Sequence, residues 1–128
     1  MNTRMLLIIA HGSRRQTSND EVRELGERIR RLNTPAIDEV RVAFLELAKP
    51  DIPEGLAQCV ADGANEIVVF PYFLAAGTHV ATDIPEEIDA FCASHPQIKV
   101  TLTPHLGASA TLPQAILEVV MADENALA

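Results

Sequence analysis

The stretch RMLLIIA at residues 4–10, followed at once by His11-Gly12-Ser13, decides the fold of this 128-residue chain. The stretch is a nearly continuous apolar run, which is typical of a parallel strand covered on both faces. A second run of this kind, EIVVFPYF, lies at residues 66–73, and shorter strand-like runs lie at residues 40–45 and 98–103. The sequence therefore predicts a parallel sheet with its first and third strands at the centre.

Helical patterns alternate with these strands, because apolar residues between them recur at every third or fourth position. The four apolar stripes are Val22, Leu25, Ile29 and Leu32; Ile52, Leu56, Cys59 and Val60; Ile84, Ile88, Phe91 and Cys92; and Leu112, Ile116, Val119 and Val120. Right-handed crossovers then give an α/β fold, a four-stranded parallel sheet of order 2-1-3-4 with helices on both faces. This is a flavodoxin- or Rossmann-related lobe.

Helix start signals accompany the stripes. Ser18-x-x-Glu21 has the form of a capping box, and Asp51 and Asp83 each precede a Pro and a Glu and can cap a helix. The repeated motif, DIPE at residues 51–54 and 83–86, is better explained by one good helix start used twice than by an ancient duplication. We expect one domain over residues 1–128, with its core at about 4–120 and a polar, fraying tail at 122–128.

Composition excludes several classes of protein. A net charge of −8 argues against general nucleic-acid binding, so no nucleic-acid partner is expected. The longest apolar run is far shorter than the roughly 20 residues that span a bilayer, and no signal peptide is evident, so no membrane association is expected. Cys59 and Cys92 lack metal-ligand spacing and are expected to be free thiols in the cytoplasm.

Histidines and one carboxylate follow the predicted strands. His11, Glu46, His79 and His105 all fall at carboxyl ends, the edge where ligands bind in such sheets. His95 falls near the opposite edge and is interpreted as structural or incidental. A single histidine at a strand end is more often a loop residue than a ligand. His11 and His79 follow the two central strands and should face one crevice. Neutral imidazoles beside a carboxylate suit Co²⁺, Fe²⁺, Ni²⁺ or Zn²⁺.

Small and basic residues surround these histidines. Gly12 and Gly77 allow either a close approach of a ligand to the backbone or an ordinary strand-to-helix turn. Ser13, Arg14 and Arg15 lead into the first helix, whose N-terminal amides favour anions such as carboxylates or phosphates. Neither the dinucleotide-binding fingerprint nor the P-loop pattern is present.

Four segments together resemble a known family. They are LIIAHGSR at residues 7–14, VAFLE at 42–46, VFPYFLAAGTHV at 69–80 and DIP at 83–85. In this order and spacing they resemble the CbiX-type sirohydrochlorin chelatases, which are class II tetrapyrrole chelatases. The resemblance runs from about residue 5 to residue 120.

The resemblance implies an enzyme that inserts a divalent metal ion into sirohydrochlorin, on the route to cobalamin or sirohaem. The metal, Co²⁺ first and Fe²⁺ or Ni²⁺ next, is a substrate, and no organic cofactor is expected. By the family pattern His11 and His79 are the metal ligands and catalytic residues, and Glu46 is an acidic catalytic residue beside the metal. The residues expected to bind the tetrapyrrole are Gly12, Ser13, Arg14, Gly77 and Thr78.

The chain is one lobe long, so it is similar to the short form of the family, in which two identical chains form a homodimer. His105 is left out of the site because the residues after it depart from the family pattern. One alternative is a non-catalytic carrier of metal or tetrapyrrole. Another is a histidine phosphatase-like enzyme, although Ala10 stands where that class has Arg before the histidine.

Overall fold

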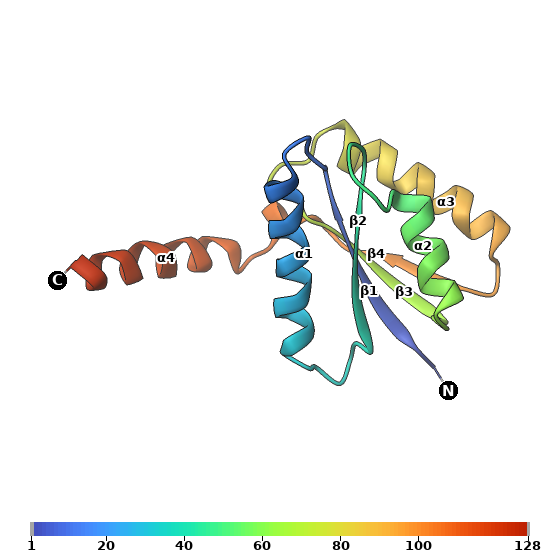
Figure 1. Ribbon diagram of the computed structural model, residues 1–128, viewed down its shortest axis with the longest axis horizontal. Helices are drawn as coiled ribbons and strands as arrows, with labels where there is room; N and C mark the ends of the chain where they lie inside the picture. The colour runs from blue at the N-terminus through green and yellow to red at the C-terminus, as the bar shows by residue number, and fades with distance from the viewer. Residues whose placement is uncertain (1, 128) are drawn as a thin grey trace.

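The computed structural model describes residues 2–127, with side chains through residue 122, and forms a four-stranded sheet flanked by helices (Figure 1). The strands lie side by side in the order β2-β1-β3-β4, and every neighbouring pair is parallel, as predicted. The strands are β1 (Arg4–Ala10), β2 (Glu39–Phe44), β3 (Glu66–Pro71) and β4 (Lys99–Leu102). The helices are α1 (Gln16–Arg31), α2 (Ile52–Ala61), the π-helical turn η1 (His79–Asp83), α3 (Ile84–Ser94), the 3₁₀ turn η2 (Leu106–Ala108) and α4 (Leu112–Leu127).

β1 lies at the centre of the sheet, where its apolar run is paired on both sides. Ile8 is in register with Val42 of β2 and with Phe70 of β3. The bounds of β1 coincide with the predicted run, whereas β3 ends at Pro71, two residues before the predicted end. The chain after Pro71 therefore leaves the sheet earlier and forms a longer loop at the carboxyl edge.

The hydrophobic core lies on one face of the sheet, beneath α2 and α3. Alternate residues of β1 (Met5, Leu7 and Ile9) point to this face, and Gly55 brings α2 so close that an added Cβ would lie 2.8 Å from that of Ala43. The remaining buried members of the cluster are Ile52, Leu56, Cys59, Ala64, Ile67, Val69, Ile84, Ile88 and Phe91. Phe91 is the one aromatic member of this cluster, in keeping with a sequence that has four Phe, one Tyr and no Trp.

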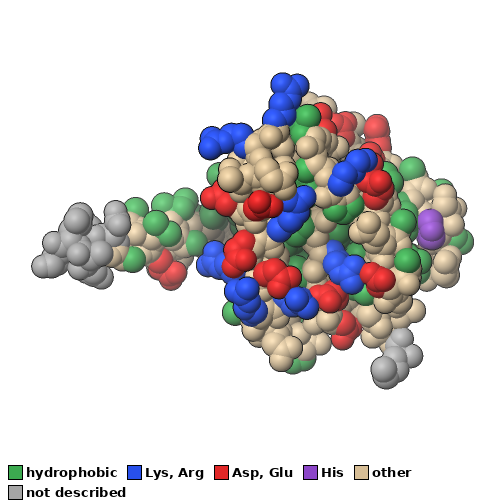
Figure 2. All heavy atoms as spheres, viewed as in Figure 1, with side chains coloured by type: hydrophobic (Ala, Val, Ile, Leu, Met, Phe, Trp, Pro, Cys, Tyr) green, Lys and Arg blue, Asp and Glu red, His purple; other side chains and the backbone are tan. Residues whose placement is uncertain are grey.

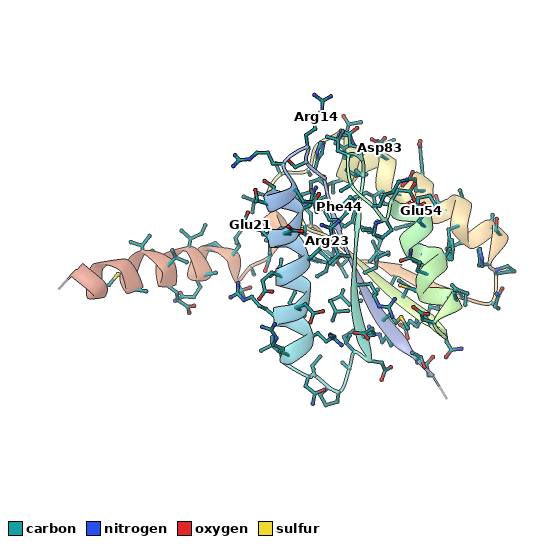
Figure 3. All side chains as sticks on the ribbon, in the orientation of Figure 1. Arg14, Glu21, Arg23, Phe44, Glu54 and Asp83 are labelled. Atoms are coloured by element: carbon teal, nitrogen blue, oxygen red, sulfur yellow. The ribbon has the colours of Figure 1, made fainter. Side chains whose placement is uncertain are left out.

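The opposite face of the sheet is covered by α1, which packs mainly on β2. Gly26 of α1 faces Val42, and the Arg23 guanidinium lies 5.1 Å from the centre of the Phe44 ring, a pair labelled in Figure 3. The only buried residues of α1 are Asn19 and Gly26. The predicted stripe of α1 is therefore incompletely covered, and its last member, Leu32, is 77% exposed.

The fourth predicted helix, α4, does not pack on the sheet of this single chain. α4 extends away from the rest of the molecule (Figure 1), and its main contact is with η2. The members Ile116, Val119 and Val120 of its predicted stripe are exposed. The backbone is helical as far as Leu127, where a fraying polar tail was predicted, and Ala128 lies outside the described residues.

Two of the three predicted helix caps are also wrong. α1 begins at Gln16, two residues before Ser18, and its N-cap Arg15 forms no side-chain cap, so the predicted capping box is not formed. The Asp83 side chain likewise forms no cap, because η1 leads directly into α3 and the Asp83 carboxylate contacts His79 instead. Only Asp51 caps as predicted, in a capping box with Glu54.

Both cysteines are free thiols, as predicted. Cys59 lies on the buried side of α2, and burial raises the pKa of its thiol to about 11. None of the helices in residues 2–127 combines the length and apolar character needed to cross a bilayer.

Candidate functional site

The loops that follow β1 and β2 are joined at the carboxyl edge of the sheet. The backbone N–H of Glu46 donates to the carbonyl of His11 over 3.1 Å, and that of Leu45 donates to Ala10 over 2.9 Å. Gly12 lies between them with φ at +95°, and a Cβ there would lie 1.8 Å from the Glu46 carbonyl oxygen. The positive φ and the close approach of the Glu46 backbone both require glycine at this turn, and an approach of a ligand to Gly12 stays a prediction.

His11 and His79 lie together at this edge, as the sequence predicts. Their ring centres are 5.2 Å apart, with an angle of 68° between the ring planes. Glu46 joins them, since its Oε1 lies 3.5 Å from Nε2 of His11. Each of the three side chains is about half exposed, so all remain open to a ligand.

Hydrogen bonds of the two Nδ1 atoms orient the rings. His79 Nδ1 lies 2.7 Å from Asp83 Oδ2, and His11 Nδ1 lies 3.1 Å from the Gly12 carbonyl oxygen. When each Nδ1–H donates to its oxygen, each Nε2 carries the lone pair of a neutral imidazole. The lone pair of His11 Nε2 then faces the Glu46 carboxylate, and two acceptors that face each other favour a cation or a proton between them.

Asp83 contacts the predicted site residue His79, although the sequence predicted only a helix cap for it. The motif predicts a helix cap, but the π-helical turn places Asp83 four residues after His79 and on the same side. A carboxylate that accepts from the second nitrogen of a metal-binding histidine fixes its tautomer and raises its basicity. The His79–Asp83 spacing of four residues is the signal that could have predicted it.

Acidic residues surround an open hollow of about 280 Å³ beside His79. Its lining consists of Leu45, Glu46, His79, Asp83, Glu86 and Glu87. The pKa of Glu87 is raised, first by its burial and then by the neighbouring charges of Asp51 and Asp83. The hollow is therefore strongly negative, which favours a cation over an anion at this point.

The loop after His11 is held by Asn19, which sequence reasoning missed. This side chain is 2% exposed, accepts from the Ser13 backbone N–H over 2.9 Å and donates to the Ser13 carbonyl over 2.8 Å. The Ser13 hydroxyl accepts in turn from the Arg15 backbone N–H over 3.0 Å. Nothing in the local pattern distinguishes Asn19 from a surface residue of α1, because its partner lies six positions away in a loop.

The other residues predicted to contact a tetrapyrrole lie around the same edge, but their side chains form no hydrogen bond with His11 or His79. These residues are Arg14, Gly77 and Thr78. Arg14 and Asp83 lie at the same end of the molecule in Figure 3. Thr78 is exposed and immediately precedes η1. A Cβ on Gly77 would meet nothing within 4 Å, so the chain itself does not require glycine there.

The two remaining histidines lie apart from this cluster. The ring of His95 stacks on that of Phe91, with centres 4.0 Å apart, at the end of α3, in agreement with its structural interpretation. His105 precedes η2. Among the side chains that the structure describes, through residue 122, no group of three or more His, Cys, Asp or Glu is arranged to hold a metal ion. The larger hollow along α1, of about 570 Å³, contains none of the predicted site residues.

Several curated proteins resemble this chain in sequence. The sirohydrochlorin ferrochelatase of Priestia megaterium is 33% identical over 113 residues, which cover 88% of this chain and 42% of the relative. The sirohydrochlorin cobaltochelatase of Methanococcus aeolicus is 34% identical over 91 residues, which cover 70% of this chain and 62% of the relative. The matched part of this chain thus spans about half the length of these relatives.

Solved structures share the fold. SirB, the sirohydrochlorin chelatase of Bacillus subtilis subspecies spizizenii, solved in complex with cobalt, superposes with a TM-score of 0.82 at 28% identity, over 94% of this chain and 50% of SirB. A CbiX protein from Marinobacter aquaeolei superposes with a TM-score of 0.79 at 27% identity, over 95% of this chain and 98% of that one. The sequence profile of the CbiX family matches residues 5–122. With the sheet order, the carboxyl-edge histidines and these likenesses in agreement, the chain belongs to the CbiX family.

Proposed function

We propose that this chain inserts a divalent metal ion into sirohydrochlorin. The observation that carries the proposal is the convergence of His11 and His79, 5.2 Å apart between ring centres, with Glu46 beside them at the carboxyl edge of the sheet. The names of the relatives, ferrochelatases and cobaltochelatases of sirohydrochlorin, support the same reaction.

The metal ion is a substrate that the two Nε2 atoms hold. Two imidazole ligands leave most coordination positions of the ion open. Open positions are needed because the ion must pass from the protein to the macrocycle. The acidic hollow with Glu46, Asp83 and Glu86 attracts the aqueous cation toward the histidines. Co²⁺ is our first choice, and Fe²⁺ and Ni²⁺ suit the same donors.

Protons must leave the macrocycle as the metal enters it. Two pyrrole N–H groups lose their protons, and an acceptor must lie within hydrogen-bond reach. Glu46 is half exposed and adjoins His11 Nε2, so it can take a proton while His11 holds the ion. His11 and His79 themselves become acceptors once the ion has left them.

The carboxylates of the tetrapyrrole need donors at the rim of the site. Arg14 is exposed, and the backbone of Gly12 and Ser13 leads into α1. Gly77 and Thr78 are exposed on the opposite loop, where open space allows a macrocycle to approach. We assign these five residues to substrate binding, where charge-assisted hydrogen bonds give the strongest contacts.

One lobe covers only one side of a planar macrocycle. The half-exposed histidines and the open hollow leave the other side to solvent, and a site that holds such a ligand is usually concave and buries most of it. We therefore assign a homodimer, in which a second copy of the chain closes the site.

The test is an optical assay of sirohydrochlorin with Co²⁺, Fe²⁺ or Ni²⁺, each with and without the chain. We expect metallation to exceed the spontaneous rate and to continue for many turnovers per chain. Metallation that stops at one product per site identifies a carrier instead. No acceleration with any of the three metals contradicts the proposal.

A further inference from the structure

Leu47 has a backbone conformation that leucine rarely adopts. Among residues 2–127, a positive φ occurs at Gly12, Gly63, Asn33 and Leu47. Glycine has no Cβ, and the short polar side chain of Asn tolerates the left-handed region, so the first three residues follow the usual pattern. Leu47, with φ at +67°, departs from it, because the Cβ of a large residue crowds the backbone in this conformation. Position 47 therefore holds an unfavourable residue.

The loop at residues 45–50 is fixed at both ends. At its start, the Glu46 N–H donates to the His11 carbonyl over 3.1 Å, and the Glu46 carbonyl oxygen lies so close to Gly12 that a Cβ would not fit there. At its end, the Phe44 N–H donates to the Pro50 carbonyl over 2.9 Å. The chain must turn back between these contacts, where a residue with positive φ is typical. Position 47 is thus held by the same contacts that join the two loops of the site.

The hydrophobic core does not account for leucine at this position. Leu47 is 52% exposed and is not part of the core cluster, whereas Leu45, two residues earlier, packs against it. An exposed leucine is ordinary by itself, and Figure 2 shows hydrophobic side chains scattered among charged ones over the body of the molecule. At a left-handed position it is not ordinary, because Gly or Asn would form the same turn without strain. Strained residues of this kind are concentrated at binding sites.

Leu47 adjoins the residues that face the metal ion. It follows Glu46, whose carboxylate lies 3.5 Å from Nε2 of His11. A tetrapyrrole can take the ion from the two Nε2 atoms only with its central nitrogens over them, so its rings extend past the histidines and over the loops beside them. A second exposed leucine, Leu74, lies in the loop after β3 that leads to His79. Exposed apolar side chains in both loops suit a flat ring system that has its charged groups at the edge.

We propose that Leu47 binds the tetrapyrrole by packing its side chain against a face of the macrocycle. This inference rests on the proposed function and adds a substrate-binding residue to it. The contact removes apolar surface of both partners from water. The fixed loop holds the side chain beside Glu46 before the substrate arrives, so little conformational freedom is lost on binding. Metal binding by the two histidines does not use this contact and should be independent of it.

Leu47→Asn separates this role from a structural one. Asn adopts the left-handed region more readily than Leu, so the urea midpoint of unfolding should stay the same or rise. The variant replaces apolar surface by a polar amide, so the Kd for metal-free sirohydrochlorin, measured by absorbance titration, should rise about 10-fold. The Kd for Co²⁺, measured by isothermal titration calorimetry, should stay unchanged.

Two further variants serve as controls. Leu47→Met keeps an apolar side chain of similar volume and should bind sirohydrochlorin as the unmodified chain does. Leu32→Asn makes the same substitution at a leucine that is 77% exposed and follows α1 at its far end from the site (Figure 1). It should leave both Kd values unchanged. Light scattering at the concentration of the titration should give the same mass for Leu47→Asn as for the unmodified chain.

Equal affinities of the unmodified chain and Leu47→Asn for sirohydrochlorin would overturn the inference and leave the proposed function intact. A lower unfolding midpoint, a lower mass or a weakened affinity for Co²⁺ in this variant would assign Leu47 to the fold, to a contact between chains or to the metal site, and would overturn the inference as well. An unmodified chain that does not bind sirohydrochlorin would contradict the proposed function and the inference together.

Discussion

His79 is oriented by a side chain, whereas His11 is oriented by the backbone carbonyl of Gly12. Both contacts use Nδ1 and leave Nε2 for a ligand, on rings whose centres are 5.2 Å apart, and Nε2 of His11 also adjoins Glu46. Only the orientation of His79 can be changed by a substitution that leaves the ring in place.

Replacing His11 or His79 by Ala should abolish catalysed metallation. Loss of a ligand or proton acceptor that acts in the transition state costs on the order of 100-fold or more in rate. Both side chains are about half exposed, so the fold should survive, as circular dichroism would check. His105→Ala is the control and should retain activity. An unchanged rate in either site variant would remove that histidine from the mechanism.

Asp83→Asn should weaken metal binding by on the order of 10-fold, because it removes the negative charge that supports His79 while keeping the shape of the side chain. Isothermal titration with Co²⁺ measures the effect. Glu86→Gln is the matched control, since Glu86 lines the same hollow without contact to the imidazole nitrogen. Equal losses in the two variants would mean that Asp83 contributes only charge to the hollow.

The two glycines of the site should respond differently to alanine. Gly12→Ala places a Cβ 1.8 Å from the Glu46 carbonyl oxygen at a φ of +95°, and we expect a loss of about 2 kcal/mol or more in the free energy of unfolding. Gly77→Ala meets open space and should stay within about 0.5 kcal/mol of the unmodified chain. Urea unfolding of both variants tests this, and similar losses in the two would contradict it.

At the scale of the elements, the two DIPE motifs form different contacts. The first forms a capping box in which Glu54 accepts from the Asp51 backbone and Asp51 accepts from that of Glu54, each over 2.9 Å. The second follows η1 without a break, and its aspartate contacts His79. The same four residues therefore stabilise a helix in one place and orient a site residue in the other.

Asp51→Ala should lower the free energy of unfolding by about 1 kcal/mol at neutral pH, the usual effect of losing a helix cap. The hydrogen bond from the Asp51 backbone and the bond to Lys49 lower the pKa of Glu54. A lowered pKa in the folded state means that this contribution is present above the ordinary glutamate pKa and is lost as pH falls through the folded value. The stability difference between the unmodified chain and Glu54→Gln should therefore shrink in acid. Urea unfolding at neutral and at acidic pH measures this difference, and an equal difference at the two pH values would contradict the prediction.

At the scale of the whole molecule, the chain is one-sided in two ways. Its core lies on the α2–α3 face, and its site residues lie at one edge of the sheet. α4 leaves from that same edge, because residues 103–111 follow the carboxyl end of β4.

Activity per chain should fall on dilution below the dimer dissociation constant and return on concentration, if a second copy closes the site. Light scattering and the optical assay, performed over one dilution series, measure assembly and activity together. A chain that is monomeric at the working concentration and still turns over at full rate would contradict the shared site.

The sequence by itself determined the sheet order, the central position of β1 and β3, and the edge at which His11, Glu46 and His79 meet. The reason is that apolar periodicity reports which elements form, and the carboxyl ends of parallel strands always lie at one edge. Local chemistry sufficed as well for the Asp51 cap, whose partners lie within one turn of helix.

Only the tertiary structure decided the roles of Asp83 and Asn19 and the position of α4. Asp83 faces His79 because a π-helical turn sets their relative rotation, and Asn19 reaches Ser13 across a loop. The stripe on α4 shows that one side of this helix needs cover, but a periodic pattern carries no information on which surface supplies it. That choice depends on the direction that residues 103–111 impose, which arises from contacts of η2 with the loop after β3.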